Sequence, residues 1–385
     1  MRVAHVITRM IVGGAQENTL YNCTDLETQY GDQVLLITGP SLGAEGQLMQ
    51  HRQKVEGLSI QVIDSLRRSI GPRDLIAYKQ IKQTIAQFAP DVVHTHSAKG
   101  GFLGRAAAWQ CRVPVIVHTV HGAPFHQYQL RLVRSAYVQL ERWAARRCHH
   151  LICVADAMTD LLVAAGVAPQ QKCTTVYSGM EVQPFLDCHQ HREQSRAQLG
   201  LKSSDILVGK IARLFHLKGH HDLLESARRV IAQDRRIHFL LVGDGLLRPE
   251  LEACIARYEL QSHFHFTGLV APENIPYYLS AMDMLVHTSL REGLARAIPQ
   301  ALIAGRPVIS YDIDGAREVV LPGQTGILVL PGSIDQLIEA ILKLANDSQL
   351  RCQLGQGGAV RFAEQFRHQY MTKQIRAIYQ RLLEN

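Results

Sequence analysis

Two basic residues that flank a short loop in the second half of the chain are the clearest candidates for a chemical role. Arg213 ends the apolar segment ILVGKIAR, and Lys218 follows in the segment LFHLKG, directly before a helical pattern. A cation at each end of a loop between a strand and a helix can hold the two phosphates of a diphosphate from two sides, because both form charge-assisted hydrogen bonds with phosphate oxygens. Taken alone, the pair is better explained as two cations on a surface loop.

An acidic residue strengthens this interpretation. Glu292 lies in the segment TSLREGLA, between the apolar segment MLVH and a further helical pattern. We expect Glu292 to project from the entrance of that helix, where the amides of Gly293–Ala295 direct partial positive charge toward a ligand. The carboxylate can accept two sugar hydroxyls, and the amides can bind a phosphate. Helix capping also explains an acidic residue here, but the combination with the two cations favours a binding site.

Paired glycines form a third candidate. Gly13 and Gly14 follow the first apolar segment, RVAHVIT, and precede a helical pattern. Glycine lets the backbone approach a ligand closely, and a helix start presents N–H groups to an anion. Packing alone also explains such glycines, and the spacing differs from the GxGxxG of dinucleotide-binding loops. Gly243, in a GDG turn, is a weaker candidate of the same kind.

Histidines suggest a different chemistry. His94 with His96, and His118 with His121, end two apolar segments of the first half. The HxH spacing occurs in metallohydrolases, so a metal-dependent hydrolase is one alternative function. No aspartate or glutamate lies within two residues of any of these histidines to complete such a site, and we expect no metal.

All these residues lie where short apolar segments end, and those segments alternate with amphipathic ones. This alternation predicts α/β architecture with parallel sheets, and the near-continuous hydrophobicity predicts strands covered on both faces. The predicted strands are RVAHVIT, QVLLIT, IQVID, DVVHTH, PVIVHTVH and HLICVA, then ILVGKIAR, HFLLVGDG, FHFTG, MLVHTS, PVISYD and GILV. The predicted helices include Asp74–Gln87, Tyr128–Arg147, His220–Ala232 and Arg367–Leu383.

A chain of 385 residues fits two such domains. A polar stretch, DCHQHREQSRAQ, follows a strand predicted to end at Ser178-Gly179 and separates the halves. We place the domains at 1–185 and 186–365. The final helix, 366–385, follows them, and the sequence leaves open on which of the two domains it packs. The carboxyl ends of both sheets are expected to face one cleft, because ligands of doubly wound folds bind there.

Composition and charge indicate where the protein is located and what kind of partner it binds. Apolar residues make up 46% of the chain, no apolar run is long enough to span a bilayer, and the scattered cysteines indicate buried thiols in a reducing cytoplasm. Residues 1–180 carry 18 Lys and Arg against 12 Asp and Glu. This half therefore faces an anionic partner, such as a membrane surface, or is simply a solvated basic surface. The segment 128–147 is either a membrane-surface helix or, as we favour, a core-packing helix with a basic outer face.

An ordered set of motifs extends nearly from end to end: GGAQ, His121-Gly122, ARLFHLKG, VGDG, FTG, YYLSAMDMLVHTSLREGL and AGRPVISYDIDGAREVV. This set resembles the retaining glycosyltransferases of family 4. The resemblance implies the GT-B fold, in which two Rossmann-like, doubly wound domains face each other across a cleft. It also implies an amino-terminal domain on the acceptor side and a carboxyl-terminal domain that binds the nucleotide sugar.

The resemblance assigns roles to individual residues. Arg213 and Lys218 would neutralise the leaving diphosphate, Glu292 would hold hydroxyls of the donor sugar, and His121 would lie beside that sugar. The nucleotide base would lie near Gly268–Pro272. The remaining residues expected to contact the donor are Gly13, Gly14, Gly243, Gly268, Val270, Gly293, Leu294, Ala295 and Gln300.

One of these residues departs from the family pattern. The family usually has a second glutamate eight residues after the first, commonly on the nucleotide ribose, and here that residue is Gln300. An amide can still accept and donate hydrogen bonds, but without the strength of a charged acceptor. Pro299 removes a helical donor, so the helix is expected to start late or to bend.

The resemblance implies an enzyme that transfers a hexose or N-acetylhexosamine from a UDP- or GDP-linked sugar to a hydroxyl of a lipid-linked or oligosaccharide acceptor. Cleavage of the glycosidic C–O bond puts charge on the β-phosphate, and the two cations can stabilise it without a metal or another cofactor. A nucleotide-sugar epimerase or hydrolase, and a non-catalytic nucleotide-sugar-binding protein, are the alternatives. We expect a cytoplasmic location, with peripheral binding at the inner face of the membrane still open, and no nucleic-acid partner.

Overall fold

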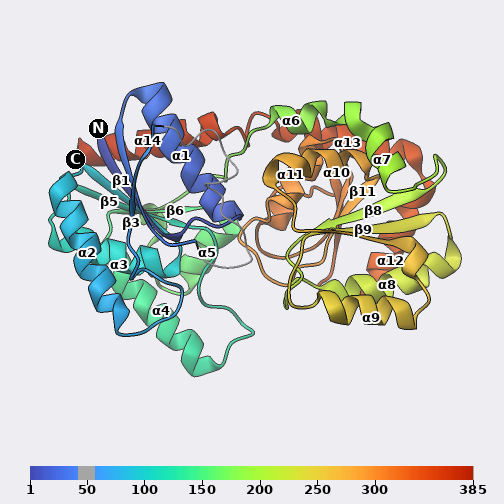
Figure 1. Ribbon diagram of the computed structural model, residues 1–385, viewed down its shortest axis with the longest axis horizontal. Helices are drawn as coiled ribbons and strands as arrows, with labels where there is room; N and C mark the ends of the chain where they lie inside the picture. The colour runs from blue at the N-terminus through green and yellow to red at the C-terminus, as the bar shows by residue number, and fades with distance from the viewer. Residues whose placement is uncertain (42–56, 385) are drawn as a thin grey trace. The chain divides into compact units, whose positions relative to one another are not determined.

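The computed structural model describes residues 1–41 and 57–384. The chain divides into two compact units, shown in Figure 1. Unit 1 consists of Met1–Met180 together with Phe366–Asn385, and unit 2 consists of Glu181–Gln365. The chain therefore passes from unit 1 to unit 2 between Met180 and Glu181, and its final helix belongs to unit 1.

Within the described residues, unit 1 contains a parallel sheet of seven strands in the order β3-β2-β1-β4-β5-β6-β7. The strands are β1 (Arg2–Arg9), β2 (Gln33–Gly39), β3 (Ser59–Val62), β4 (Val92–His96), β5 (Val115–Val120), β6 (His150–Cys153) and β7 (Cys173–Thr175). The helices are α1 (Gly14–Tyr30), α2 (Arg73–Phe88), α3 (Ala98–Gln110), α4 (Arg131–Ala145), α5 (Asp156–Ala164) and α14 (His368–Leu383).

Unit 2, which is described throughout, contains a parallel sheet of six strands in the order β10-β9-β8-β11-β12-β13. The strands are β8 (Ile206–Ile211), β9 (Ile237–Val242), β10 (Phe264–Gly268), β11 (Met284–His287), β12 (Val308–Tyr311) and β13 (Gly326–Val329). The helices are α6 (Gln183–Leu186), α7 (Arg192–Gln198), α8 (His220–Gln233), α9 (Arg248–Arg257), α10 (Ile275–Ala281), α11 (Ala297–Ile303), α12 (Ile334–Asn346) and α13 (Ser348–Phe362).

Both sheets have the strand order of a Rossmann fold. In each, the first three strands run outward in one direction and the chain then returns to the centre, so the order reverses between β1 and β4 in unit 1 and between β8 and β11 in unit 2. Ligands of such sheets bind outside the carboxyl ends of the strands at this switch point. The predicted α/β class, with two doubly wound Rossmann-like domains, is therefore confirmed.

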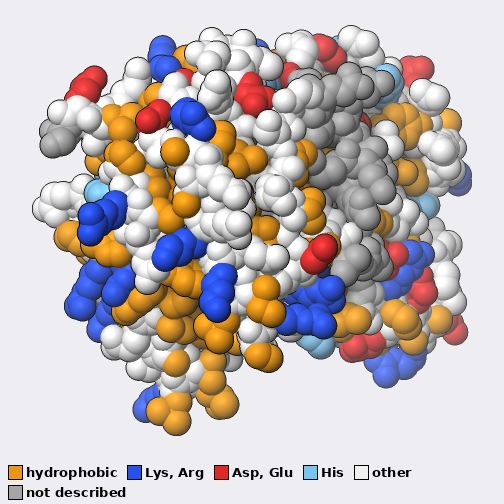
Figure 2. Space-filling model, turned by 60° about the vertical axis from the view of Figure 1, so that its left-hand side comes forward, with side chains coloured by type: hydrophobic (Ala, Val, Ile, Leu, Met, Phe, Trp, Pro, Cys, Tyr) orange, Lys and Arg blue, Asp and Glu red, His pale blue; other side chains and the backbone are white. Residues whose placement is uncertain are grey.

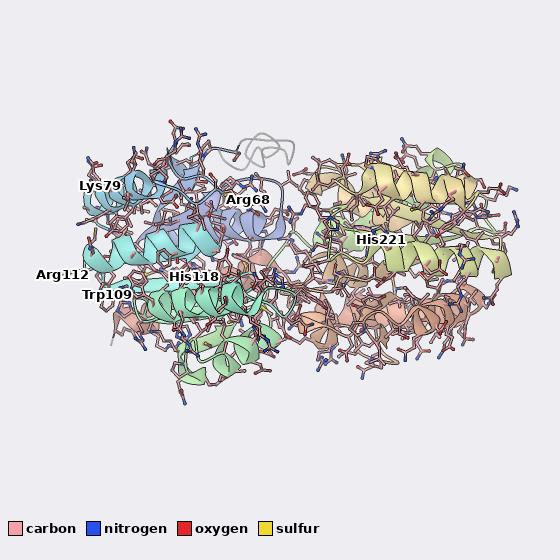
Figure 3. All side chains as sticks on the ribbon, turned by 90° about the horizontal axis from the view of Figure 1, so that it is seen from below. Arg68, Lys79, Trp109, Arg112, His118 and His221 are labelled. Atoms are coloured by element: carbon pink, nitrogen blue, oxygen red, sulfur yellow. The ribbon has the colours of Figure 1, made fainter. Side chains whose placement is uncertain are left out.

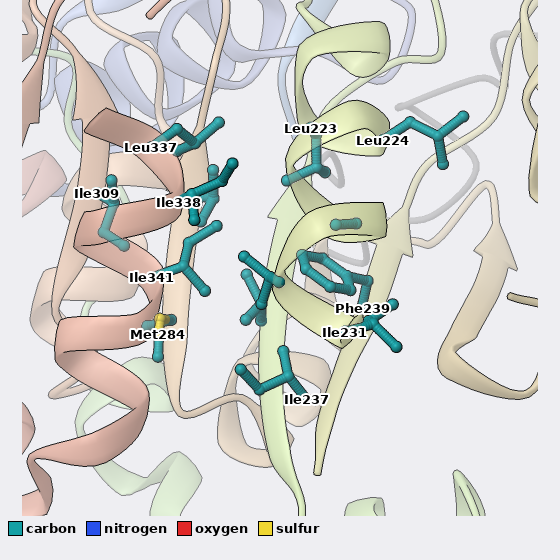
Figure 4. Close-up of a cluster of buried hydrophobic side chains, with 14 of the residues drawn as sticks. Leu223, Leu224, Ile231, Ile237, Phe239, Met284, Ile309, Leu337, Ile338 and Ile341 are labelled. Carbon is teal, nitrogen blue, oxygen red and sulfur yellow. The ribbon is translucent and has the colours of Figure 1, made fainter. Parts of the chain in front are cut away.

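Apolar side chains from strands and helices form the core of unit 2. Leu223 of α8 and Phe239 of β9 belong to the same buried cluster as Ile309 of β12 and Ile341 of α12 (Figure 4). All four side chains are almost completely excluded from solvent. The strands are apolar along their length because helices cover both faces of the sheet.

The final helix completes unit 1 through polar contacts as well as apolar ones. His368 Nδ1 lies 2.7 Å from the carboxylate of Asp25 on α1, and Arg376 donates to Asp32 at 2.9 Å. The Tyr379 hydroxyl lies 2.5 Å from Nδ1 of His94 in the sheet. Apolar residues of α14 also belong to the core cluster of this unit. The alternative in which the last helix packs on the second unit is therefore not observed.

Most predicted strands agree with the structure. The strand predicted to end at Ser178-Gly179 is β7, which ends at Thr175. Beyond it, Met180 forms an isolated bridge with Arg367, directly before α14. All eight cysteines lie among the described residues and are free thiols, of which Cys352 is exposed. None of the helices in the described parts of the chain is both long and apolar enough to cross a bilayer.

Helix α4 differs from the favoured interpretation of its sequence. Its buried residues are only Glu141, Ala144 and Ala145, whereas Leu132 is 86% exposed. Glu141 is buried because it pairs with the fully buried Arg105 of α3 at 2.9 Å. The interpretation of this segment as a core-packing helix is therefore wrong, since most of its large apolar side chains are exposed, namely Leu132, Val133, Leu140 and Trp143.

Candidate functional site

Arg213 lies just after β8, on the turn that leads to α8. Its side chain is exposed, and its guanidinium carbon lies over the ring of Phe215, 5.1 Å from the ring centroid. Nε2 of His220, at the start of α8, lies 3.0 Å from the Arg213 carbonyl oxygen and links the two ends of the turn. Gly219 ends the turn with a φ of 64°, and a Cβ there would lie 1.9 Å from the carbonyl oxygen of Thr288. Only glycine fits at this position.

A buried lysine supports the end of this turn. Lys210 of β8 is 2% exposed, and its Nζ donates to Oγ1 of Thr288 at 2.7 Å. The same hydroxyl donates to the carbonyl oxygen of Gly219 at 2.6 Å. Burial lowers the pKa of Lys210 to about 7, and the charge of Lys218 acts in the same direction. The hydrogen bonds fix the turn against the segment that follows β11.

Lys218, on this turn, forms an ion pair with Glu292. Its Nζ donates to Oε1 of Glu292, and about one fifth of each side chain is exposed, 20% and 21%. His287, the last residue of β11, places Nε2 3.7 Å from the same oxygen. Burial by itself would raise the pKa of Glu292. The neighbouring His287 and Lys218 lower it by more, so the pKa of Glu292 lies well below its usual range. Glu292 is therefore an ionised carboxylate, which can accept hydrogen bonds from hydroxyl groups.

The loop that carries Glu292 is held by Asp314. Oδ2 of Asp314 accepts the backbone N–H of Glu292 at 2.6 Å, and the N–H of Gly315 donates to the carbonyl oxygen of Gly293 at 3.1 Å. Helix α11 begins only at Ala297. The prediction that Glu292 projects from a helix entrance formed by residues 293–295 is therefore wrong: these residues form an irregular segment before the helix.

The late start of α11 follows from its sequence. Pro299 is the third residue of the helix, where a missing N–H removes no intrahelical hydrogen bond. Gln300, the next residue, is half-buried, and its backbone N–H donates to the Arg296 carbonyl oxygen at 3.1 Å. Of the two expected outcomes, a late start or a bend, the structure therefore shows the late start.

Two more predicted residues lie at neighbouring strand ends of unit 2. Gly243 follows β9 and Gly268 ends β10, and the N–H of Gly243 donates to the carbonyl oxygen of Gly268 at 3.0 Å. Gly243 has a φ of 137°, and a Cβ there would lie 2.2 Å from the Ala212 carbonyl oxygen, directly before Arg213. Val270 is half-buried in the loop after β10. These residues flank the Arg213 turn at the same edge of the sheet.

The remaining predicted residues belong to unit 1. Gly13 precedes α1, which begins at Gly14 after β1. The φ of Gly13 is 171°, an extended conformation, and a Cβ would meet only the flexible end of Gln16 at 2.8 Å. Packing within unit 1 therefore does not require glycine at position 13. His121 directly follows β5, and its Nε2 lies 3.2 Å from Nδ1 of His96.

Within unit 2, the structure brings Lys218 and Glu292 into contact and places Arg213 on the same turn as Lys218. It adds residues that sequence reasoning did not assign, namely Lys210, Thr288, His287 and Asp314. Asp314 lies in the motif YDIDGAREVV, so a signal was present, but only the fold reveals which backbone group its carboxylate holds. Arg213 and Glu292 follow β8 and β11, the two strands of the switch point.

Two family descriptions match the chain. "Glycosyl transferase 4-like domain" matches residues 13–179, which lie in unit 1, and "Glycosyl transferases group 1" matches residues 191–361, which lie in unit 2. The UDP-Gal:alpha-D-GlcNAc-diphosphoundecaprenol alpha-1,3-galactosyltransferase of Escherichia coli is 27% identical over 367 residues, 91% of this chain and 89% of the relative. Putative glycosyltransferase EpsD of Bacillus subtilis is 26% identical over 308 residues, 78% and 80% of the two chains.

Solved structures agree with this assignment at the level of the fold. Anabaena Alr3699/HepE in complex with UDP and glucose has a TM-score of 0.84 and 21% identity, with 99% of each chain covered. Sucrose-phosphate synthase from Thermosynechococcus elongatus has a TM-score of 0.83 and 19% identity, with 99% of this chain and 98% of that one covered. Because the two family matches together cover most of both units and the relatives are named glycosyltransferases, the protein belongs to the group 1 glycosyltransferases, enzymes with the GT-B fold.

Proposed function

We propose that the protein is a retaining glycosyltransferase that moves a hexosyl or N-acetylhexosaminyl group from a UDP-linked sugar to a hydroxyl of a lipid-linked or oligosaccharide acceptor. The observation that carries this proposal is the Lys218–Glu292 ion pair at the switch point of the unit 2 sheet. It combines a cation suited to a leaving phosphate with an ionised carboxylate suited to sugar hydroxyls. Both groups lie where nucleotides bind to sheets of this kind.

The chemistry follows from these charges. When the glycosidic C–O bond breaks, negative charge develops on the β-phosphate, and fixed cations that face it lower the barrier. Lys218 and Arg213 supply that charge in this proposal, so no metal is required. The departing phosphate oxygen takes the proton of the acceptor hydroxyl, and the anomeric configuration is retained.

The relatives support the choice of donor and acceptor. The E. coli relative is named for UDP-galactose and for an acceptor on diphosphoundecaprenol. A Staphylococcus aureus relative, 22% identical, is named for capsular polysaccharide biosynthesis. We therefore propose UDP rather than GDP as the nucleotide, and a role in the assembly of a surface polysaccharide or glycolipid.

Thermal-shift and transfer assays test this function. UDP is expected to raise the melting temperature more than GDP does, because a ligand of the folded state stabilises it. UDP-linked hexoses and N-acetylhexosamines are then incubated with lipid diphosphate sugars, and UDP release is measured with and without acceptor. Full-rate release without acceptor would instead indicate a hydrolase or epimerase. Stabilisation by UDP-sugars without transfer to any acceptor would indicate a binding protein.

The Glu292→Gln variant tests the contact with the sugar. We expect affinity for the UDP-sugar to fall by about tenfold or more, on the scale of a charged hydrogen bond, while UDP affinity changes much less. Calorimetric titration with UDP and with the UDP-sugar measures both values. An equal loss of both affinities would contradict a role for Glu292 at the sugar.

Helix α4 supports the proposal that the enzyme binds an anionic membrane surface. Leu130 and Leu132 are 78% and 86% exposed, and Arg131 and Arg134 beside them are also exposed. Figure 2 shows apolar and basic side chains interspersed toward its lower left, and α4 lies at the lower edge of unit 1 in Figure 1. Leucines can enter the acyl boundary while arginines bind anionic headgroups. A lipid-linked acceptor would be met at that surface.

Vesicle flotation tests the membrane proposal. The protein is expected to float with phosphatidylcholine vesicles that contain phosphatidylglycerol, less so at high salt, and not with phosphatidylcholine alone. Replacing Leu130 and Leu132 together by serine should weaken this binding by tenfold or more, because two apolar side chains no longer insert. Val360→Ser on α13 is the matched control, since Val360 is 88% exposed but lies in unit 2. Equal flotation of both variants would contradict the proposal.

A further inference from the structure

Three imidazoles form a continuous hydrogen-bonded chain at the switch point of unit 1. Nδ1 of His5, on β1, lies 3.0 Å from Nε2 of His96, the last residue of β4. Nδ1 of His96 lies 3.2 Å from Nε2 of His121, which directly follows β5. The rings of His5 and His96 are stacked, with 12° between their planes. The chain connects the interior of the sheet with the residue that the family resemblance places beside the donor sugar.

The surroundings hold this chain in place. His5, His94 and His96 have no exposed surface, and His118, which is labelled in Figure 3, is also buried. His94 is fixed by Thr119 Oγ1 at 2.6 Å and by the hydroxyl of Tyr379. Burial lowers the pKa of His5 to about 3 and holds the pKa of His96 well below its usual range. Both imidazoles are therefore neutral at physiological pH.

A metal ion does not explain this cluster. His5, His94 and His96 place one nitrogen each within 4.8 Å of one another. Among the described residues, however, five of their six ring nitrogens already have a hydrogen-bond partner, and only Nε2 of His5 has none. Coordination by all three rings would need three lone pairs aimed at one point, and the hydrogen bonds to Tyr379, Thr119 and between the rings occupy them.

The hydrogen bonds constrain where the protons are. A neutral imidazole has one N–H and one lone pair, so His96 donates through one nitrogen and accepts through the other. In one arrangement, His5 donates to His96 and His96 donates to His121. In the other, both bonds run in the opposite direction, and His5 then carries its proton on Nε2.

The unpartnered nitrogen of His5 decides between these arrangements. Nε2 of His5 is buried without a hydrogen-bond partner among the described residues. Buried N–H groups without an acceptor are rarer in proteins than acceptors without a full set of donors, and an unmet donor costs free energy. The first arrangement leaves only a lone pair there, and it makes Nε2 of His121 an acceptor.

We propose that His5 and His96 are positioning residues that hold the His121 imidazole in the tautomer with its proton on Nδ1. His121 then presents an N–H donor, rather than a lone pair, through the nitrogen that does not face His96. In glycosyl transfer, a consequence that rests on the proposed function, this group donates to an oxygen of the donor and does not act as a base.

Nitrogen NMR of protein labelled with ¹⁵N-histidine tests the tautomer directly. His121 is assigned from the signals lost in His121→Gln, and wild-type protein is expected to show its proton on Nδ1. His96→Leu removes the donor to Nε2 and should leave His121 in a mixture of tautomers. His150→Leu is the matched control, because His150 is another buried strand histidine, bonded to Thr174 at 2.8 Å and outside the chain. It should leave the His121 signals unchanged.

Several results would overturn the proposal. These are a wild-type His121 with its proton on Nε2, an unchanged tautomer in His96→Leu, and stoichiometric metal in the purified protein. The wild-type spectrum decides the question even if His96→Leu does not fold.

In the transfer assay, His96→Leu should lower kcat/KM by about tenfold, the scale of one lost hydrogen bond to a charged or reacting group. Absence of transfer in the wild type would refute the proposed function, whereas the NMR result would stand independently.

Discussion

Replacing Lys218 by alanine is expected to lower turnover by about a hundredfold or more, the scale observed when one donor to a developing oxyanion is removed. The ammonium of Lys218 lies on a turn fixed by Gly219 and Thr288, so its charge is held in place before the leaving group develops its own. Steady-state UDP release at saturating donor measures the effect. We expect the variant to fold, because Lys218 lies on a turn and does not belong to the apolar core cluster of unit 2.

Lys343→Ala is the appropriate control for this variant. Lys343 is also in unit 2, on α12, but is exposed and lies far along the chain from the turn. Its replacement removes the same charge from the domain and should leave turnover unchanged. Near-normal turnover in Lys218→Ala, with circular dichroism like that of the wild type, would refute the role of Lys218 at the leaving group.

A second large effect is expected from Gly219→Ala. Alanine at a φ of 64° is strained, and its Cβ would lie 1.9 Å from the carbonyl oxygen of Thr288, so either the turn or the segment after β11 must move. We expect the free energy of unfolding to fall by about 2–4 kcal/mol. A displacement of about 1 Å in Lys218 would also lower turnover on the order of a hundredfold. Urea unfolding and the transfer assay measure the two effects.

Gly200→Ala separates the clash from the backbone strain. Gly200, also in unit 2, has a φ of 69°, but no atom lies within 4 Å of the position of its Cβ. This variant should lose only about 1 kcal/mol and retain normal turnover. If both alanine variants behaved alike, the contact between the turn and Thr288 would have no part in positioning Lys218.

The sequence was sufficient for the fold because the strand signal is strong in doubly wound proteins. FHFTG and GILV coincide with β10 and β13, since strands covered on both faces are apolar throughout and end abruptly at polar turns. The signal was weaker where tertiary contacts decide. The exposed apolar side chains of α4 have the periodicity of a buried face, and no local pattern distinguishes the two cases.

The candidate site was predicted only in part. Lys218 and Glu292 lie in recognisable motifs, and their contact confirms that these motifs meet in space. Asp314 and Thr288 act through hydrogen bonds to backbone groups of other segments, which sequence spacing does not reveal. The same holds for His5, which lies 91 residues from His96 and shares no motif with it.

The placement of α14 has a consequence for synthesis of the protein on the ribosome. Unit 1 is built from two separate stretches of chain, and the whole of residues 181–365 is translated between them. At about 5–20 residues per second, this delay lasts roughly 10–40 s. During that time the nascent amino-terminal stretch lacks Ile375 and Tyr379, which complete its apolar cluster. We therefore expect cotranslational chaperones to bind this unfinished apolar surface.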